Sequence, residues 1–229
     1  MDRGEADGHE EGTEYGKTDR KEENRVGTGL AKIISIVFHP FLMPLWGGLV
    51  LLYGPTYLVI LPNSIKLYIL GVLALTTFFF PAFTIGVMKN LKILSDYSLG
   101  HRRERILPLV TVILGYIICY YLFQSFISIG LLPQIVMGAM SIILICFVVN
   151  LFWKISLHMA AAGGIMAVFL FVTWMGYGQL GTILLCSILL SGCLGSARLY
   201  LEKHNIWQIL AGTIAGIGGM LLVLYLFWV

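Results

Sequence analysis

The segment Ser196-Ala-Arg-Leu-Tyr-Leu-Glu-Lys-His-Asn-Ile-Trp-Gln208 joins two long apolar stretches, residues 180–198 and 205–229. It carries Arg198 and, six positions later, His204, where a membrane helix would meet water. A helix needs about 20 mostly apolar residues to cross a bilayer, and each neighbouring stretch has about that length. The segment therefore predicts a membrane hairpin of two helices with polar chemistry at its turn.

The whole chain has the composition of an integral membrane protein. Of its 229 residues, 58% are hydrophobic and 12% are charged, and the mean hydropathy is +0.88. Soluble domains carry about 25% charged residues, so a soluble globular domain is excluded. We expect an all-α, polytopic helix bundle with about seven (six to seven) transmembrane helices. The candidate spans are residues 31–53, 66–88, 107–128, 132–153, 155–176, 180–198 and 205–229.

The charges predict a tail, a membrane domain and an orientation. Residues 1–29 hold five basic and nine acidic residues, a net charge of −4, and are expected to form a disordered tail. Residues 30–229 form the transmembrane domain and carry a net charge of +7. With seven spans, nearly every ionisable group beyond the tail lies on the side of the N-terminus, and Lys66 lies alone on the other. The positive-inside rule then predicts a multi-pass membrane protein with a cytoplasmic N-terminus.

Three polar clusters are expected on that one face: His101–Pro108, Lys154–His158 and Arg198–His204. On a straight helix Arg198 and His204 would point apart, because residues six positions apart lie about 240° around the axis. Asn205 is a favoured N-cap residue, and Gln208 three residues later completes a capping-box pattern, so a helix break before Asn205 is predicted. Ser156 has the same relation to the fifth span and would leave His158 in its first turn. The three clusters are therefore expected to form one site surrounded by helix N-termini, histidines and arginines. Such a site favours the binding of an anion.

The clusters resemble the three signatures of the phosphatidic acid phosphatase type 2 and haloperoxidase superfamily. Arg198, five residues and His204 are similar to its third signature, and Lys154-Ile-Ser-Leu-His158 is similar to its second, Pro-Ser-Gly-His. The region from Arg103 to Pro108 is similar to a worn form of the first. The resemblance covers roughly residues 90–212 and identifies the chain as a divergent bacterial membrane member of that superfamily.

The resemblance implies a membrane phosphatase that acts on a lipid phosphate or pyrophosphate through a phosphohistidine. His204 would be the nucleophile, His158 the general acid, and Gln208 the residue that orients His204. The substrate phosphate would be bound by a separate group of side chains: Arg198, Arg105, Arg103, Ser156 and Lys154. We expect no cofactor and no metal. The expected partners are the lipid bilayer and the lipid phosphate, with no nucleic acid.

Several departures from the signatures leave a second hypothesis open. Gln208 stands where the superfamily has an aspartate, Ile155 and Leu157 replace the proline and glycine of the second signature, and Ser98 replaces a lysine of the first. Under this second hypothesis, the chain is a catalytically weakened or inactive relative that binds anionic lipid headgroups or a partner membrane protein. His39 and His101 are interpreted as incidental interfacial histidines, and His39-Pro40 as an irregular start to the first span.

Overall fold

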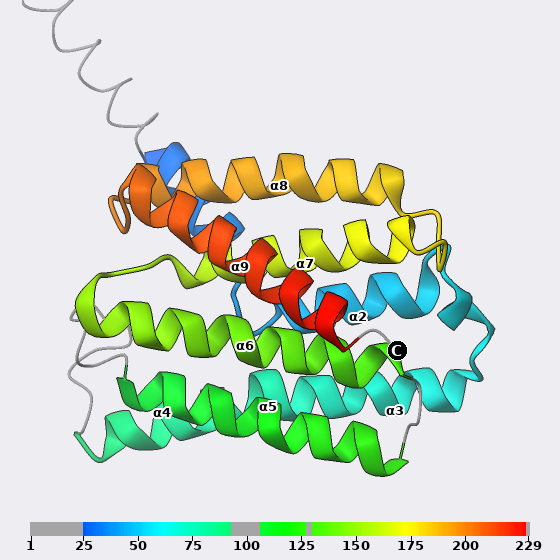
Figure 1. The fold of residues 1–229 in the computed structure, drawn as a ribbon. Coiled ribbons are helices and arrows are strands. Elements are labelled where there is room, and N and C mark those ends of the chain that lie inside the picture. Colours follow the sequence, from blue (N-terminus) through cyan, green and yellow to red (C-terminus); the bar gives the residue numbers. More distant parts are fainter. Residues whose placement is uncertain (1–24, 93–105, 127–129, 228–229) are drawn as a thin grey trace, which may run out of the picture.

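The computed structural model describes residues 25–92, 106–126 and 130–227, and in these ranges it is an all-α bundle without strands (Figure 1). Six of the described helices are long and apolar enough to cross a membrane. This confirms the predicted polytopic bundle of six to seven spans. The first of the six combines α3 (Asn63–Leu73), the π-helical turn η2 (Ala74–Phe79) and α4 (Phe80–Asn90). The others are α5 (Ile106–Phe126), α6 (Leu131–Phe152), α7 (Leu157–Trp174), α8 (Gly181–Tyr200) and α9 (Ile206–Leu226).

The predicted span 31–53 is not one helix. Residues 25–37 are helical, the chain turns at residues 38–42, and α2 (Met43–Tyr53) follows. The residue before a proline is pushed out of the helical region by the proline ring, so the helix ends before His39-Pro40. The carbonyl of His39 accepts hydrogen bonds from the backbone N–H groups of Leu42 (2.9 Å) and Met43 (3.2 Å), which closes the turn. Residues 25–29, the end of the predicted tail, belong to the helix.

Among the described helices, α7 and α9 pack backbone against backbone, and small residues make this approach possible. A Cβ atom added at Gly216 would collide with the carbonyl oxygen of Ala160, and one added at Gly163 would lie 2.5 Å from that of Thr213. Small residues at such positions let membrane helices approach closely. The Gly212–Gly216 pair therefore lets α9 approach the backbone of α7.

The two ends of the bundle differ in chemistry. At one end, named here the polar end, α4, α6 and α8 finish and α5, α7 and α9 begin (left in Figure 1). At the opposite, far end, the backbones of the loops around Thr56 and Gly178 pair as a short antiparallel bridge. Lys66 lies there and is buried, donating a hydrogen bond to the carbonyl of Val59 at 2.7 Å beneath the Tyr53 ring.

Candidate functional site at the polar end

The turn between α8 and α9 has the hydrogen bonds of a Schellman motif, which stops α8 just after Arg198. The N–H of Lys203 donates to the carbonyl of Arg198 at 3.2 Å, and the N–H of Glu202 donates to that of Leu199 at 2.9 Å. Glu202 has a φ of 52°, the left-handed conformation that this motif requires and that glycine usually supplies. The chain therefore reverses within a few residues and places His204 directly before α9.

Asn205 and Gln208 form the predicted capping box at the start of α9. The Asn205 side chain accepts a hydrogen bond from the N–H of Gln208 at 3.0 Å. In return, the Oε1 atom of Gln208 accepts one from the N–H of Asn205 at 3.3 Å. Both bonds satisfy backbone donors that a helix N-terminus leaves without a partner. They also fix the orientation of the Gln208 amide, because only its oxygen can accept from a backbone N–H.

The same Gln208 oxygen lies 3.0 Å from Nδ1 of His204. Because this oxygen only accepts, Nδ1 must donate, and the neutral His204 ring carries its lone pair on Nε2. His204 is buried, with 8% of its surface exposed. The arrangement fixes the tautomer of the His204 ring, with the lone pair of the neutral imidazole on Nε2.

Ser156 and His158 bring the start of α7 to the same place. The N–H of Ser156 donates to the backbone carbonyl of Gln208 at 3.3 Å, which joins the starts of α7 and α9. Ser156 occupies the predicted N-cap position, but its side chain makes no capping hydrogen bond. Its hydroxyl is fully buried and has no hydrogen-bond partner among the described residues. His158 lies in the first turn of α7, and its Nε2 is 3.2 Å from the carbonyl oxygen of Ser35.

These elements enclose a cavity of about 310 Å³, named here the polar cavity. Three predicted site residues, His158, Arg198 and His204, line it together. Gln208 lies outside the lining and is hydrogen-bonded to His204. Ser156 and Lys154 lie outside its lining. The full lining is Ser35, Ile36, His39, Pro40, Phe41, Pro108, Leu109, Val112, Leu157, His158, Arg198, Lys203 and His204.

The first predicted cluster is described only in part. Arg103 and Arg105, predicted to bind the phosphate, lie outside the described residues. The described chain resumes at Ile106, and Pro108 in the first turn of α5 lines the polar cavity. The start of α5 is thus adjacent to the site that the other two clusters form.

His39 is the residue of this cavity that sequence reasoning missed. Its ring packs edge-on against that of His158, with 5.5 Å between the ring centres. Its Nδ1 accepts a hydrogen bond from the N–H of Phe41 at 3.3 Å. In the sequence His39 has the pattern of a single, incidental interfacial histidine, and it lies 119 positions from His158 with no local pattern that connects the two. The helix of residues 25–37 ends before His39, so helical spacing from Ser35 could not have indicated this contact.

The electrostatics of the polar cavity favour an anion. Within the described part of the chain, its lining contains Arg198 and Lys203 and no carboxylate. Burial and the charge of Arg198 lower the pKa of His39, which lies outside the six membrane-spanning helices, to about 4. His39 is therefore neutral near pH 7 and offers an N–H group rather than a charge. No three His, Cys, Asp or Glu side chains group as metal ligands within the described ranges.

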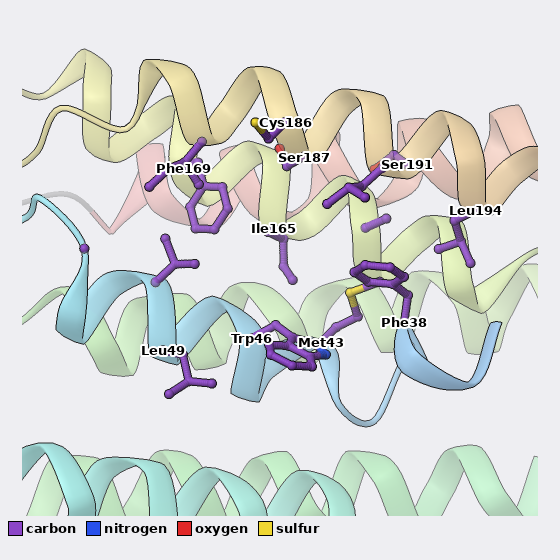
Figure 2. Close-up of a pocket in the computed structure, with 15 residues that line it drawn as sticks. Phe38, Met43, Trp46, Leu49, Ile165, Phe169, Cys186, Ser187, Ser191 and Leu194 are labelled. Atoms are coloured by element: carbon purple, nitrogen blue, oxygen red, sulfur yellow. The ribbon is translucent and has the colours of Figure 1, made fainter. Parts of the chain in front are cut away.

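A second cavity, named here the apolar groove, is lined in part by residues that lie close in sequence to the lining of the polar cavity. It has a volume of about 500 Å³ and lies between α2, α7 and α8. Figure 2 shows Trp46 of α2, Ile165 of α7 and Leu194 of α8 around it. At one end it is lined by Phe38 and Leu194. Phe38 directly precedes His39, and Leu194 lies one helical turn before Arg198.

Comparison of the chain with protein-family models, with curated proteins and with solved structures found no match. The function is therefore inferred from the chemistry of the polar cavity and of the apolar groove.

Proposed function

We propose that the protein is a membrane phosphatase that removes phosphate or pyrophosphate from a lipid through a phosphohistidine on His204. The observation that carries the proposal is the Nδ1 atom of His204 held 3.0 Å from the Gln208 oxygen, in a basic cavity shared with His158 and Arg198. Phosphoryl transfer depends mainly on positioning and on electrostatic stabilisation of the phosphoryl oxygens. A fixed imidazole beside a guanidinium offers both.

The proposed reaction has two steps. In the first, Nε2 of His204 attacks the phosphorus and the bond from phosphorus to the lipid oxygen breaks. His158, protonated on Nδ1 when the anionic phosphate is bound beside it, gives that proton to the lipid oxygen. In the second, water attacks the phosphohistidine and gives a proton to His158, and the phosphorus–nitrogen bond breaks. Nδ1 of His158 exchanges the proton, because its Nε2 faces the Ser35 carbonyl. Arg198 stabilises the charge on the phosphoryl oxygens in both steps.

The apolar groove supports a lipid as the substrate. A phosphate in the polar cavity would lie beside the end of the groove that Phe38 and Leu194 line. The groove is suited to a hydrocarbon chain, because aliphatic and aromatic side chains make up most of its lining. The hydrocarbon part of a lipid phosphate would occupy it while the phosphate reaches Arg198 and His204.

The test is phosphate release by the purified protein in lipid nanodiscs, with phosphatidate, phosphatidylglycerophosphate and a polyprenyl pyrophosphate as substrates. We expect release by the wild type and none by His204→Ala. Gln208→Glu is the matched variant, because it keeps the side-chain length and adds a charge that stabilises the His204 imidazolium, so it should raise the rate. Release that is the same with and without His204, on all three substrates, would contradict the proposal.

The uncharged Gln208 favours one alternative, a protein that binds anionic lipid headgroups without hydrolysis. In a serine-protease triad, replacing the orienting aspartate with asparagine lowers turnover by about 10⁴. Under this alternative, the wild type and Gln208→Glu both bind phosphatidate, and neither releases phosphate. The same nanodisc experiment separates the two functions.

A further inference from the structure

The chain segment from Ser35 to Phe41 forms a wall of the polar cavity that belongs to none of the three predicted clusters. Five of its residues line the cavity: Ser35, Ile36, His39, Pro40 and Phe41. The backbone carbonyl of Ser35 faces Nε2 of His158 at 3.2 Å, and the His39 ring contacts the His158 ring. This wall therefore positions His158 and places two further polar side chains in the cavity.

The Ser35 hydroxyl is a donor without a partner. Its side-chain oxygen is buried, the residue is 7% exposed, and no hydrogen-bond partner lies near it among the described residues. A buried hydroxyl of this kind is costly to leave unsatisfied. Because Ser35 lines the cavity, a ligand with acceptor oxygens in the cavity would satisfy it.

The His39 ring presents a second donor. Its Nδ1 accepts from the N–H of Phe41, so the neutral ring carries its proton on Nε2. The backbone around it is held by the turn, in which the His39 carbonyl accepts two hydrogen bonds. The ring has little freedom to turn away, because it is packed between Phe41 and His158.

We propose that Ser35 Oγ and His39 Nε2 donate hydrogen bonds to the phosphoryl oxygens of the bound ligand, which makes the segment before α2 a fourth element of the anion site. This inference rests on the proposed function only in taking a phosphate as the ligand. The two donors are neutral, so they complement the charge of Arg198 without adding repulsion between cations in the empty site. A phosphate has enough acceptor lone pairs to bind these donors and the guanidinium together.

Ser35→Ala gives the sharpest test, because it should maintain or raise the stability of the protein without phosphate and lower its affinity for phosphate. The probe is inorganic phosphate added to the full-length protein in nanodiscs, with binding measured by equilibrium dialysis and by the shift in unfolding temperature. Without phosphate, Ser35→Ala should be at least as stable as the wild type, because an unsatisfied buried hydroxyl is removed. Its affinity for phosphate should fall by about tenfold, the loss of one charge-assisted hydrogen bond.

His39 is tested with a pair of variants. His39→Phe keeps a ring against His158 but has no donor, and it should weaken phosphate binding by about tenfold. His39→Gln restores a donor near the Nε2 position and should bind within about threefold of the wild type. Wild-type affinity in His39→Phe would show that the ring acts only in packing and would overturn the role of His39.

The control is Thr173→Ala, at the end of α7 away from the polar cavity, where the hydroxyl donates to the carbonyl of Phe169 at 2.8 Å. It should leave phosphate affinity unchanged. A parallel measurement with dioctanoyl phosphatidate shows whether the same donors act on a lipid headgroup. Because binding is measured without turnover, the experiment distinguishes failure of this inference from failure of the proposed function. No phosphate binding by the wild type contradicts both proposals. Equal binding by the wild type, Ser35→Ala and His39→Phe overturns this inference alone.

Discussion

A single oxygen of Gln208 serves both the helix and the histidine. It accepts the N–H of Asn205 at 3.3 Å, which completes the cap of α9, and it lies 3.0 Å from Nδ1 of His204. Capping and ring orientation are therefore coupled in one side chain. Two substitutions in the same capping box separate these roles.

We predict that Asn205→Ala lowers the free energy of unfolding by about 1 kcal/mol, the usual value of an N-cap, and changes phosphate release little. Gln208→Ala should cost a similar amount of stability, and it should also lower turnover by at least about tenfold, because the His204 tautomer is no longer fixed. Unfolding in detergent and phosphate release in nanodiscs measure the two effects. Equal turnover in both variants would mean that Gln208 acts on the helix alone.

At the residue scale, what the sequence predicts best is local. The Asn205–Gln208 capping box is confirmed, because three-residue spacing determines it. The prediction that Ser156 is the N-cap residue of α7 is correct in position, but its hydroxyl makes no capping hydrogen bond. The direction of this hydroxyl depends on how α7 packs against α9, which local sequence does not determine. The contact of His39 with His158 was not predictable, since a long-range packing arrangement brings the two rings together.

At the scale of elements, the site depends on how closely α7 and α9 pack. The starts of both helices meet where Ser156 donates to the carbonyl of Gln208, and the close approach continues through Gly212 and Gly216. A side chain in place of the hydrogen at Gly212 or Gly216 would push the two helices apart and so move His158 away from His204. The four-residue spacing of Gly212 and Gly216 is typical of such packing, but it does not indicate that the packing brings two histidines to one cavity.

We predict that Gly216→Ala destabilises the protein by about 1–3 kcal/mol, the usual cost of overpacking, and lowers phosphate release with it. The cause is the collision of the new Cβ atom with the Ala160 carbonyl. Gly218→Ala is the matched control two positions along α9, since a Cβ atom there meets nothing within 4 Å. It should be neutral or slightly stabilising, because alanine is the better helix former. Thermal unfolding in detergent measures both, and equal stability would contradict the proposed close contact.

The sequence predicts an irregular backbone at His39-Pro40 but not the division of residues 31–53 into two helices. The pair His39-Pro40 indicated an irregular start, and the structure turns the chain there. Hydropathy over residues 31–53 nevertheless suggested one span, because both short helices are apolar. Hydropathy reports the composition of a segment and carries no information on where its backbone turns.

At the scale of the whole molecule, the polar end and the far end should be accessible from opposite sides of the membrane. The charge distribution predicts that the polar end faces the cytoplasm. In a cysteine-free protein, Asn90→Cys at the end of α4 and Ile60→Cys, 82% exposed at the far end, are matched probes. An impermeant thiol reagent added to intact cells should label Ile60→Cys, and Asn90→Cys only after permeabilisation. The reverse pattern would place the polar cavity on the outer face.

The apolar groove between α2 and α8 has a kinetic consequence. A ligand whose hydrocarbon lies there arrives by diffusion in the plane of the bilayer, so the quantity that saturates the protein is its mole fraction among lipids. Adding inert lipid at a constant total amount of ligand should then slow the reaction, as surface dilution does. Adding water should leave the rate per protein unchanged.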